Sequence, residues 1–359
     1  MVKKKDEIQE DKPQEGNFTE RILKEVEKEF GKGIFISIAD VKEDPPEWFS
    51  ISPNLDIITG GKGFKEGSFN QVSGTTGMGK SSIILAACVS AQKKGRMIYW
   101  DNVENRADEK ILTGIEGLDP SPDKFMIFGS SRKEKRVLLG SEHLKICEKI
   151  IRTHPGCVLV IDSLASLAGD RESADGLGAG MAGAANCGMV TQWVRLIKDV
   201  VYVNKVTVIA TQKMSSNVSG YGAALKEKGA LEYSHQCDCK LIAKSKHYWE
   251  AGEKKIGLIT KWVCDKSPQG PPGQETESYI RFGIGPDRKY EILELGKLMP
   301  GLINKAGSWY TIDFLKEEGI DEDKLRFQGD FKVYQAFQDN PEWFEKLSAK
   351  VKEFMGGDK

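Results

Sequence analysis

A glycine-rich segment containing one lysine and one hydroxyl residue has the spacing of a phosphate-binding loop. Residues 74–81 read Gly-Thr-Thr-Gly-Met-Gly-Lys-Ser and match the pattern G-x-x-x-x-G-K-[ST] at every fixed position. The backbone N–H groups of such a loop surround phosphate oxygens, while Lys80 is expected to reach the β- and γ-phosphates and Ser81 to ligate Mg²⁺. The predicted nucleotide-binding residues are Gly74, Thr75, Thr76, Gly77, Met78, Gly79, Lys80, Ser81 and Ser82.

Acidic residues follow two apolar segments that have the character of strands. Residues 157–162 are apolar and end in Asp162, which is expected to hold Mg²⁺ through its hydration shell. Hydrolysis of a nucleoside triphosphate also needs a carboxylate that orients and deprotonates water. Asp101 and Glu104 follow the strand predicted at residues 97–100, and either carboxylate is a candidate for this role. A solvated surface acid is the alternative for each of them.

One amide and one group of metal-type residues are further candidates. Gln212 directly follows the apolar segment 206–211, where it is expected to report the state of the γ-phosphate to the next segment, unless it only caps a turn. The candidate zinc ligands are His235, Cys237, Cys239 and His247. Their spacing matches no strong zinc signature, and buried thiols are the favoured interpretation.

Composition excludes several classes of protein. The chain has 359 residues, of which 39% are hydrophobic and 29% charged, so a mainly disordered chain is excluded. It has no apolar run near the ~20 residues of a membrane span, and residues 1–7 do not resemble a signal peptide. We therefore expect a cytoplasmic protein with no membrane partner and with reduced cysteines. A net charge of −1 means that any nucleic-acid binding depends on a local basic patch.

Hydrophobic periodicity predicts an α/β protein with four regions. Residues 1–16 are a polar tail, and residues 17–49 form an arm with a helix over 17–30 and a strand over 34–38. Residues 50–284 form a core of alternating elements, and residues 285–359 a small α/β domain ending in a helix from Pro341. The core strands are expected at 69–73, 97–101, 157–162, 206–211 and 240–243, with helices at 81–94, 143–153 and 189–203. This alternation is typical of a mostly parallel sheet covered on both faces.

Two segments interrupt the alternation directly after core strands. Residues 168–188 are rich in Gly, Ala and Asp, and residues 213–229 are rich in Gly, Ser and Lys. Because ligands bind at the carboxyl ends of the strands in such sheets, both segments are expected at the ligand-binding edge.

The sequence resembles the RecA-type recombinases over about residues 18–355. The resemblance rests on residues 29–33 with the alternating segment after them, on residues 160–167, and on the phosphate loop. Late in the chain, residues 295–296, 302–303, 305–310 and 339–342 are similar to the C-terminal domain of the bacterial and phage branch. The resemblance implies a RecA-like P-loop ATPase core with a mostly parallel sheet, an N-terminal helix-strand polymerisation arm and a small C-terminal α/β domain.

The resemblance also implies roles for individual residues. The family places its catalytic glutamate four residues before an aspartate that contacts adenine, and Glu104 and Asp108 keep this spacing. This favours Glu104 over Asp101, although two residues separate them where the family more often has one. Tyr290 falls at the place of an aromatic residue near the base. Lys266 corresponds to a lysine that reaches the γ-phosphate of the adjoining subunit, and Cys264 replaces a second such lysine.

The two Gly-rich segments resemble the DNA-binding loops of the family, with basic residues for the phosphates and an apolar side chain inserted between bases. The predicted DNA contacts are Arg171, Arg195, Lys213, Met214, Val218, Tyr221, Lys226 and Lys228. In addition, Glu232 stands where the family usually has a basic residue.

The function implied is that of an ATP- and Mg-dependent recombinase with DNA-dependent ATPase activity. Such a protein forms a helical filament on single-stranded DNA, pairs it with a homologous duplex, exchanges strands in DNA repair, and works with a single-strand-binding protein or loader. The alternatives are a ring helicase of the same superfamily and a non-catalytic recombination mediator.

Overall fold

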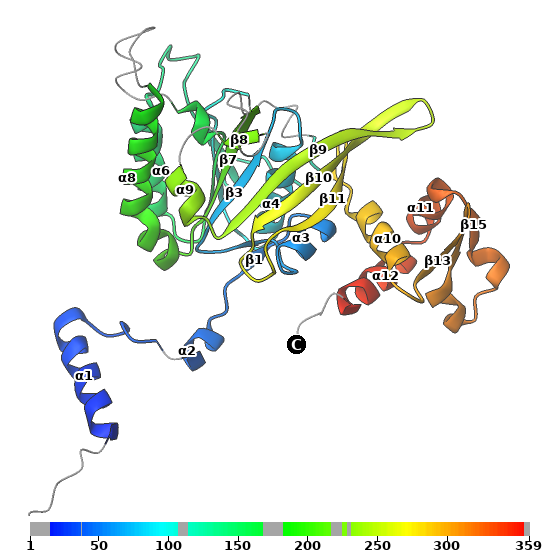
Figure 1. The fold of residues 1–359 in the computed structure, drawn as a ribbon, viewed down its shortest axis with the longest axis horizontal. Helices are drawn as coiled ribbons and strands as arrows, with labels where there is room; N and C mark the ends of the chain where they lie inside the picture. Colours follow the sequence, from blue (N-terminus) through cyan, green and yellow to red (C-terminus); the bar gives the residue numbers. More distant parts are fainter. Residues whose placement is uncertain are drawn as a thin grey trace, which may run out of the picture. The chain divides into compact units, whose positions relative to one another are not determined.

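The computed structural model of the chain describes residues 15–36, 38–106, 114–167, 182–216, 225–227 and 231–354. The chain divides into two compact units, Met1–Pro46 and Glu47–Lys359 (Figure 1). In the first unit the helices are α1 (Glu15–Phe30) and α2 (Ile38–Glu43). The helices of the second unit are α3 (Pro53–Ile58), α4 (Lys80–Lys93), α6 (Gly140–Thr153), α8 (Ala182–Val203), α9 (Leu231–Gln236), α10 (Arg288–Leu298), α11 (Asp330–Asp339) and α12 (Pro341–Phe354).

The described strands form three sheets. The small sheets pair β1 (Trp48–Phe49) with β2 (Phe64–Lys65), and join β13 (Ile303–Ala306), β14 (Trp309–Ile312) and β15 (Arg326–Gln328). The strands of the large sheet are β3 (Phe69–Gly74), β4 (Ile98–Asp101), β5 (Phe125–Phe128), β6 (Val158–Ile161), β7 (Thr207–Ser216), β8 (Leu225–Glu227), β9 (Cys239–Ala251), β10 (Lys254–Lys266), β11 (Gln274–Arg281) and β12 (Gly285–Pro286).

The large sheet is mixed, and its parallel part carries the phosphate loop. Its strand order is β12-β11-β10-β9-β3-β7-β6-β4-β5, and β8 pairs with β7. The neighbours from β9 through β3, β7, β6 and β4 to β5 are parallel, whereas β9, β10, β11 and β12 are joined by antiparallel pairing. The predicted α/β fold with a mostly parallel sheet is therefore confirmed.

Helices cover both faces of this sheet, as alternation along β6 shows. Val158 and Val160 pack into a cluster that contains the buried face of α4, including Ile83 and Ile84. The residues between and after them on β6 pack into a second cluster with α6 and α8. Side chains of a strand alternate between the two faces, so a continuously apolar strand is buried on both. Figure 1 shows α6, α8 and α9 together beside the strands.

The described residues of the segment predicted as the arm strand do not form a strand. Residues 34 and 35 form a bend, and α2 begins at Ile38. The side chains of Ile34, Phe35 and Ile36 are more than half exposed. A strand needs a partner for its N–H and C=O groups, and no strand among the described residues pairs with this segment. The predicted helix of the arm does form, as α1.

The C-terminal region has a hydrophobic core of its own. Its buried residues come from α10, β13, β14, α11 and α12 and from the segments between them, with Leu347 and Val351 of α12 fully buried. The predicted helix from Pro341 is thus present as α12. Across the described part of the chain, no helix is long and apolar enough to cross a membrane.

Candidate phosphate-binding site

The phosphate loop joins the end of β3 to the start of α4. Gly79 precedes α4 with φ +81°, and an added Cβ there would clash with the side chain of Ile280. The left-handed backbone therefore favours glycine, while the Ile280 contact is with the end of a flexible side chain. The Lys80 ammonium donates hydrogen bonds to the carbonyl oxygens of Gly74 at 3.1 Å and Thr75 at 2.8 Å. These bonds fold the lysine back over its own loop.

Asp162 lies at the end of β6, in contact with two hydroxyl groups. The Thr211 hydroxyl donates to Oδ1 at 2.6 Å, and the Ser81 hydroxyl donates to Oδ2 at 3.4 Å. Burial raises the pKa of Asp162 above its usual value, although the Thr211 hydrogen bond opposes this effect. Mg²⁺ prefers oxygen ligands and commonly takes one or two carboxylates together with substrate phosphates. One carboxylate beside the Ser81 hydroxyl fits that ion.

Glu104 has both carboxylate oxygens in polar contacts. The Ser163 hydroxyl donates to Oε1 at 2.7 Å, Lys213 Nζ lies 3.0 Å from the same oxygen, and Arg106 Nη1 lies 3.1 Å from Oε2. Partial burial disfavours the ionised form, but the Ser163 hydrogen bond and the two cations outweigh it. The pKa of Glu104 is therefore held below its ordinary value. At neutral pH the side chain is a carboxylate.

Asp101, the other candidate base, lies in a closed environment. Its side chain is fully buried, His143 Nδ1 lies 2.6 Å from Oδ1, and the Cys147 thiol donates to Oδ2 at 3.6 Å. Burial raises the pKa of Asp101. Of the two predicted candidates, only Glu104 lines the cavity described next.

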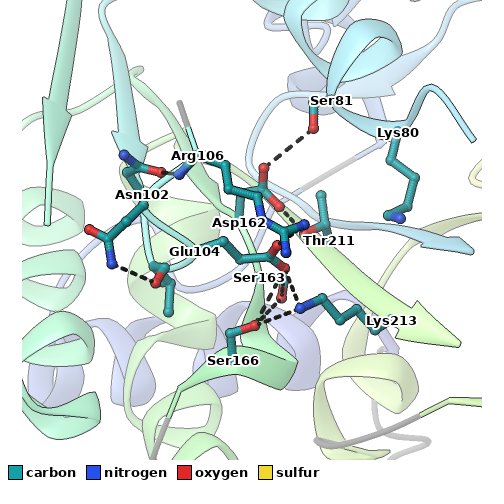
Figure 2. A network of polar contacts seen from close by, with 12 residues as sticks. Lys80, Ser81, Asn102, Glu104, Arg106, Asp162, Ser163, Ser166, Thr211 and Lys213 are labelled. Carbon is teal, nitrogen blue, oxygen red and sulfur yellow. Dashed lines mark hydrogen bonds and ion pairs between the residues drawn. The ribbon is translucent and has the colours of Figure 1, made fainter. Parts of the chain in front are cut away.

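A cavity of about 330 Å³ brings the phosphate loop and the acids together. It is lined by Thr76, Gly77, Met78, Gly79, Lys80, Ser81, Ser82, Trp100, Glu104, Arg106, Asp162, Lys213 and Leu258. Figure 2 shows Lys80, Arg106 and Lys213 around the carboxylates of Glu104 and Asp162. Three cations facing one cavity favour a polyanionic ligand. The loop and the cavity have the features expected for the phosphates of a nucleotide.

Two residues predicted at the nucleotide lie elsewhere. Gln212 is buried but does not line the cavity, because it alternates along β7 with Thr211 and Lys213, whose side chains contact the acids. Tyr290 packs among aromatic rings, with ring centroids 4.6 Å from Trp249 and 4.8 Å from Tyr279. Asp108 lies outside the described residues.

Lys266 contacts a helix end of its own subunit. Its ammonium donates to the carbonyl oxygens of Ser234 and His235, each at 2.9 Å, in the last turn of α9. The neighbouring Cys264 is buried, and its thiol donates to the Lys266 carbonyl at 3.0 Å. The side chain of Cys264 is thus directed inward.

The predicted DNA-binding residues are only partly described. Arg171, Val218, Tyr221 and Lys228 lie outside the described residues. Arg195 is exposed on α8, Met214 is half-buried on β7, and Lys226 lies on β8. The first residues of the second predicted loop belong to a β-hairpin, because β7 continues to Ser216 and pairs with β8.

Within the described ranges, no group of three or more His, Cys, Asp or Glu side chains is arranged to hold a metal ion.

Lys213 is the clearest departure from the sequence-based prediction. The sequence places Lys213 in a loop, whereas the structure places it on β7 with its side chain lining the phosphate cavity. The DNA contact of Lys213 itself stays a prediction. Sequence reasoning also missed Arg106 and Trp100, which line the same cavity. The only signal was position, because Trp100 directly precedes Asp101 at the end of the predicted strand and Arg106 follows Glu104 by two.

Comparisons with known proteins agree with this architecture. Residues 17–286 match the family model described as the RecA N-terminal domain. The protein RecA of Thermotoga neapolitana is 26% identical over 348 residues, which cover 96% of this chain and 94% of that protein. The protein RecA of Acholeplasma laidlawii is 28% identical over 335 residues, or 93% of this chain and 95% of that protein. The protein RecA of Aquifex aeolicus is 26% identical over 341 residues, covering 93% and 91% of the two chains.

Proposed function

The chain belongs to the RecA family, and we propose that it is a DNA-dependent ATPase that exchanges homologous DNA strands. It would assemble as a helical filament on single-stranded DNA and pair that strand with a homologous duplex, in recombination and repair. The observation that carries the proposal is the single cavity that joins Lys80, Ser81, Asp162 and Glu104. These residues supply, within one chain, the phosphate contact, the metal contacts and the base that hydrolysis needs.

Each residue has a chemical task in this proposal. The loop N–H groups and Lys80 bind the phosphates of ATP, and Ser81 and Asp162 hold Mg²⁺, which supplies positive charge at the phosphates when bound. Glu104 accepts the proton of the attacking water. Its low pKa keeps it ionised, and Ser163 orients it. A carboxylate fixed by a hydroxyl and two cations is already in place before substrate arrives, which lowers the cost of orienting it.

DNA contact is proposed for the edge of the sheet that carries β7 and β8. The residues proposed to contact DNA are Arg171, Arg195, Met214, Val218, Tyr221, Lys226 and Lys228, of which Met214 and Lys226 lie on these two strands. The near-neutral net charge of the chain means that affinity for DNA rests on such a local patch. Assembly is proposed to use the N-terminal unit, whose apolar residues 34–36 are exposed in the single chain.

Electron microscopy with single-stranded DNA and a slowly hydrolysed ATP analogue tests the assembly. Helical filaments are expected, together with ATP hydrolysis that rises when DNA is added. Closed rings would instead indicate a helicase of the same superfamily. Isolated particles without hydrolysis would indicate a recombination mediator, and either result would overturn the proposal. Strand exchange is then measured with a labelled homologous duplex.

A further inference from the structure

The phosphate cavity holds more positive charge than its loop supplies. Lys80 comes from the loop, Arg106 from the segment after β4, and Lys213 from β7. In the sheet, Lys213 is the register partner of Gly74, the residue at which the phosphate loop begins. Strand pairing therefore delivers the Lys213 side chain to the carboxyl edge of the sheet, beside the loop and within the same subunit.

The contacts of Lys213 lie inside the cavity. Its ammonium is 3.0 Å from Oε1 of Glu104 and donates to the Ser166 hydroxyl at 3.2 Å (Figure 2). The side chain of Lys213 is 36% exposed and that of Glu104 is 11% exposed, so the ion pair is partly shielded from water. A half-buried ammonium that faces both the loop and the base is placed where charge develops during phosphoryl transfer.

Arg106 is the weaker candidate for the same task. Its side chain is 63% exposed and contacts Oε2 of Glu104 at 3.1 Å. An exposed guanidinium loses more of its interaction to solvent screening than a half-buried ammonium does. Lys213 also has a support in the sheet, because its own position on β7 pairs with Gly74 of β3, and β7 pairs with β6 up to Ala210.

We propose that Lys213 is a catalytic residue that acts on the ATP of its own subunit, with its ammonium on the γ-phosphate oxygens. The inference rests on the proposed ATPase function. Water attacks the γ-phosphorus, the bond from that phosphorus to the β,γ-bridging oxygen breaks with its electron pair on ADP, and Glu104 accepts the proton of the water. Lys213 keeps its protons and stabilises the charge on the transferred group, while its contact with Oε1 positions Glu104.

The test compares Lys213→Met, which keeps the length and removes the charge, with Lys213→Arg, which keeps the charge. Lys145→Met, an exposed lysine on α6, is the matched control. We expect Lys213→Met to lower kcat about 10²-fold, both without and with single-stranded DNA, as loss of a preorganised charge typically does. We expect Lys213→Arg to recover part of this loss and the control to match the wild-type chain.

Nucleotide binding separates a phosphate contact from a merely structural ion pair. Calorimetry with Mg²⁺ is expected to show about tenfold weaker binding of a non-hydrolysable ATP analogue to Lys213→Met than to the wild-type chain. The affinity for ADP should change by less than about twofold, because only the analogue has a γ-phosphate. Equal losses for both ligands would overturn the proposal in favour of a structural role. A faster rate would overturn it by showing that Lys213 restrains Glu104.

A third arm measures single-stranded DNA affinity over a salt series. Wild-type hydrolysis with weakened DNA binding and a flatter salt slope in Lys213→Met would make Lys213 a DNA contact and overturn the proposal. If the wild-type chain itself hydrolyses no ATP, the ATPase proposal fails. The comparison of the ATP analogue with ADP still decides the phosphate contact of Lys213.

Discussion

The imidazole Nδ1 of His143 lies 2.6 Å from Oδ1 of Asp101, and both side chains are buried. This contact ties α6 to the end of β4, three residues before Glu104. It explains why two acids so close in sequence differ in their surroundings. Asp101 links the end of β4 to α6, whereas Glu104 lines the cavity.

Substitution of the two acids is therefore expected to give opposite phenotypes. Glu104→Gln should keep ATP binding and stability but slow hydrolysis by about 10²–10⁴-fold, because an amide cannot accept the proton. Asp101→Asn should leave hydrolysis within a few-fold and lower the free energy of unfolding by about 1–3 kcal/mol, because a buried charge-assisted contact is weakened. Single-turnover hydrolysis and urea unfolding measure the two effects. Lost hydrolysis with wild-type stability in Asp101→Asn would make Asp101 the base.

Removing the charge of the loop tests the phosphate site itself. Lys80→Ala is expected to abolish measurable hydrolysis, since the β- and γ-phosphates lose the one ammonium that the loop provides. The fold should be retained, because the Lys80 ammonium donates its hydrogen bonds to carbonyl oxygens of its own loop. Hydrolysis is measured by phosphate release and the fold by circular dichroism. Substantial turnover in a folded Lys80→Ala chain would place the phosphates elsewhere.

The sequence predicts best the strands that are buried on both faces of the sheet. The strand at 157–162 is continuously apolar and forms β6, fully buried. The hairpin of β9 and β10 extends far beyond the predicted strand at 240–243. The sequence does not predict this extension, because residues 244–248 are exposed and polar or aromatic, with no apolar alternation. Cross-strand pairing, which the local pattern does not encode, sustains that hairpin.

The site was predictable where a residue is fixed by a motif. Lys80, Ser81 and Asp162 lie together as their positions in the loop and at a strand end imply. The sequence predicts a loop at Lys213 because a segment rich in Gly, Ser and Lys begins there, but pairing of β7 with β8 extends the strand past it. The alternation that turns Lys213 into the cavity and Gln212 away depends on that extension. The segment at residues 34–38 has strand-like alternation, yet alternation alone supplies no partner strand.

A buried carboxylate in α10 predicts a pH dependence of stability. Glu291 accepts hydrogen bonds from the backbone N–H groups of Asn54 at 3.0 Å and Tyr279 at 3.1 Å. Burial raises the pKa of Glu291 from the usual 4.5 to about 7. Between these two values the folded chain keeps a proton that the unfolded chain has released, so the free energy of unfolding falls as pH rises through this range.

Glu291→Gln should remove this contribution. The decrease in the free energy of unfolding between about pH 5 and about pH 7.5 should become smaller, by up to about 3 kcal/mol. Urea unfolding at both pH values, followed by tryptophan fluorescence, measures it. Glu317→Gln, at an exposed position, is the matched control and should keep the wild-type pH dependence. An unchanged dependence in Glu291→Gln would show that another group titrates there.

The ammonium of Lys266 has two competing partners if the chain assembles as proposed. In the single chain it donates to the Ser234 and His235 carbonyls at the end of α9. The two carbonyls take two of the three N–H donors of this ammonium, so contact with a phosphate on the adjoining subunit would use the third donor or release a carbonyl. Lys266→Ala is therefore expected to bind ATP nearly normally as a monomer, but to show no rise in hydrolysis when DNA nucleates a filament.

A mixing experiment decides whether Lys266 acts on the neighbouring ATP. Lys266→Ala carries a competent phosphate loop, and Lys80→Ala carries a competent Lys266, so each variant alone should be inactive in filaments. Mixed on single-stranded DNA, the two variants should regain activity at those junctions where an intact loop meets an intact Lys266. The reason is that phosphoryl transfer needs positive charge on more than one side of the γ-phosphate. Lys289→Ala, at an exposed position on α10, replaces Lys266→Ala in the control mixture and is expected to be active by itself. No recovery in filaments shown by microscopy to contain both variants, or full stimulation of Lys266→Ala alone, would confine Lys266 to its role at the end of α9.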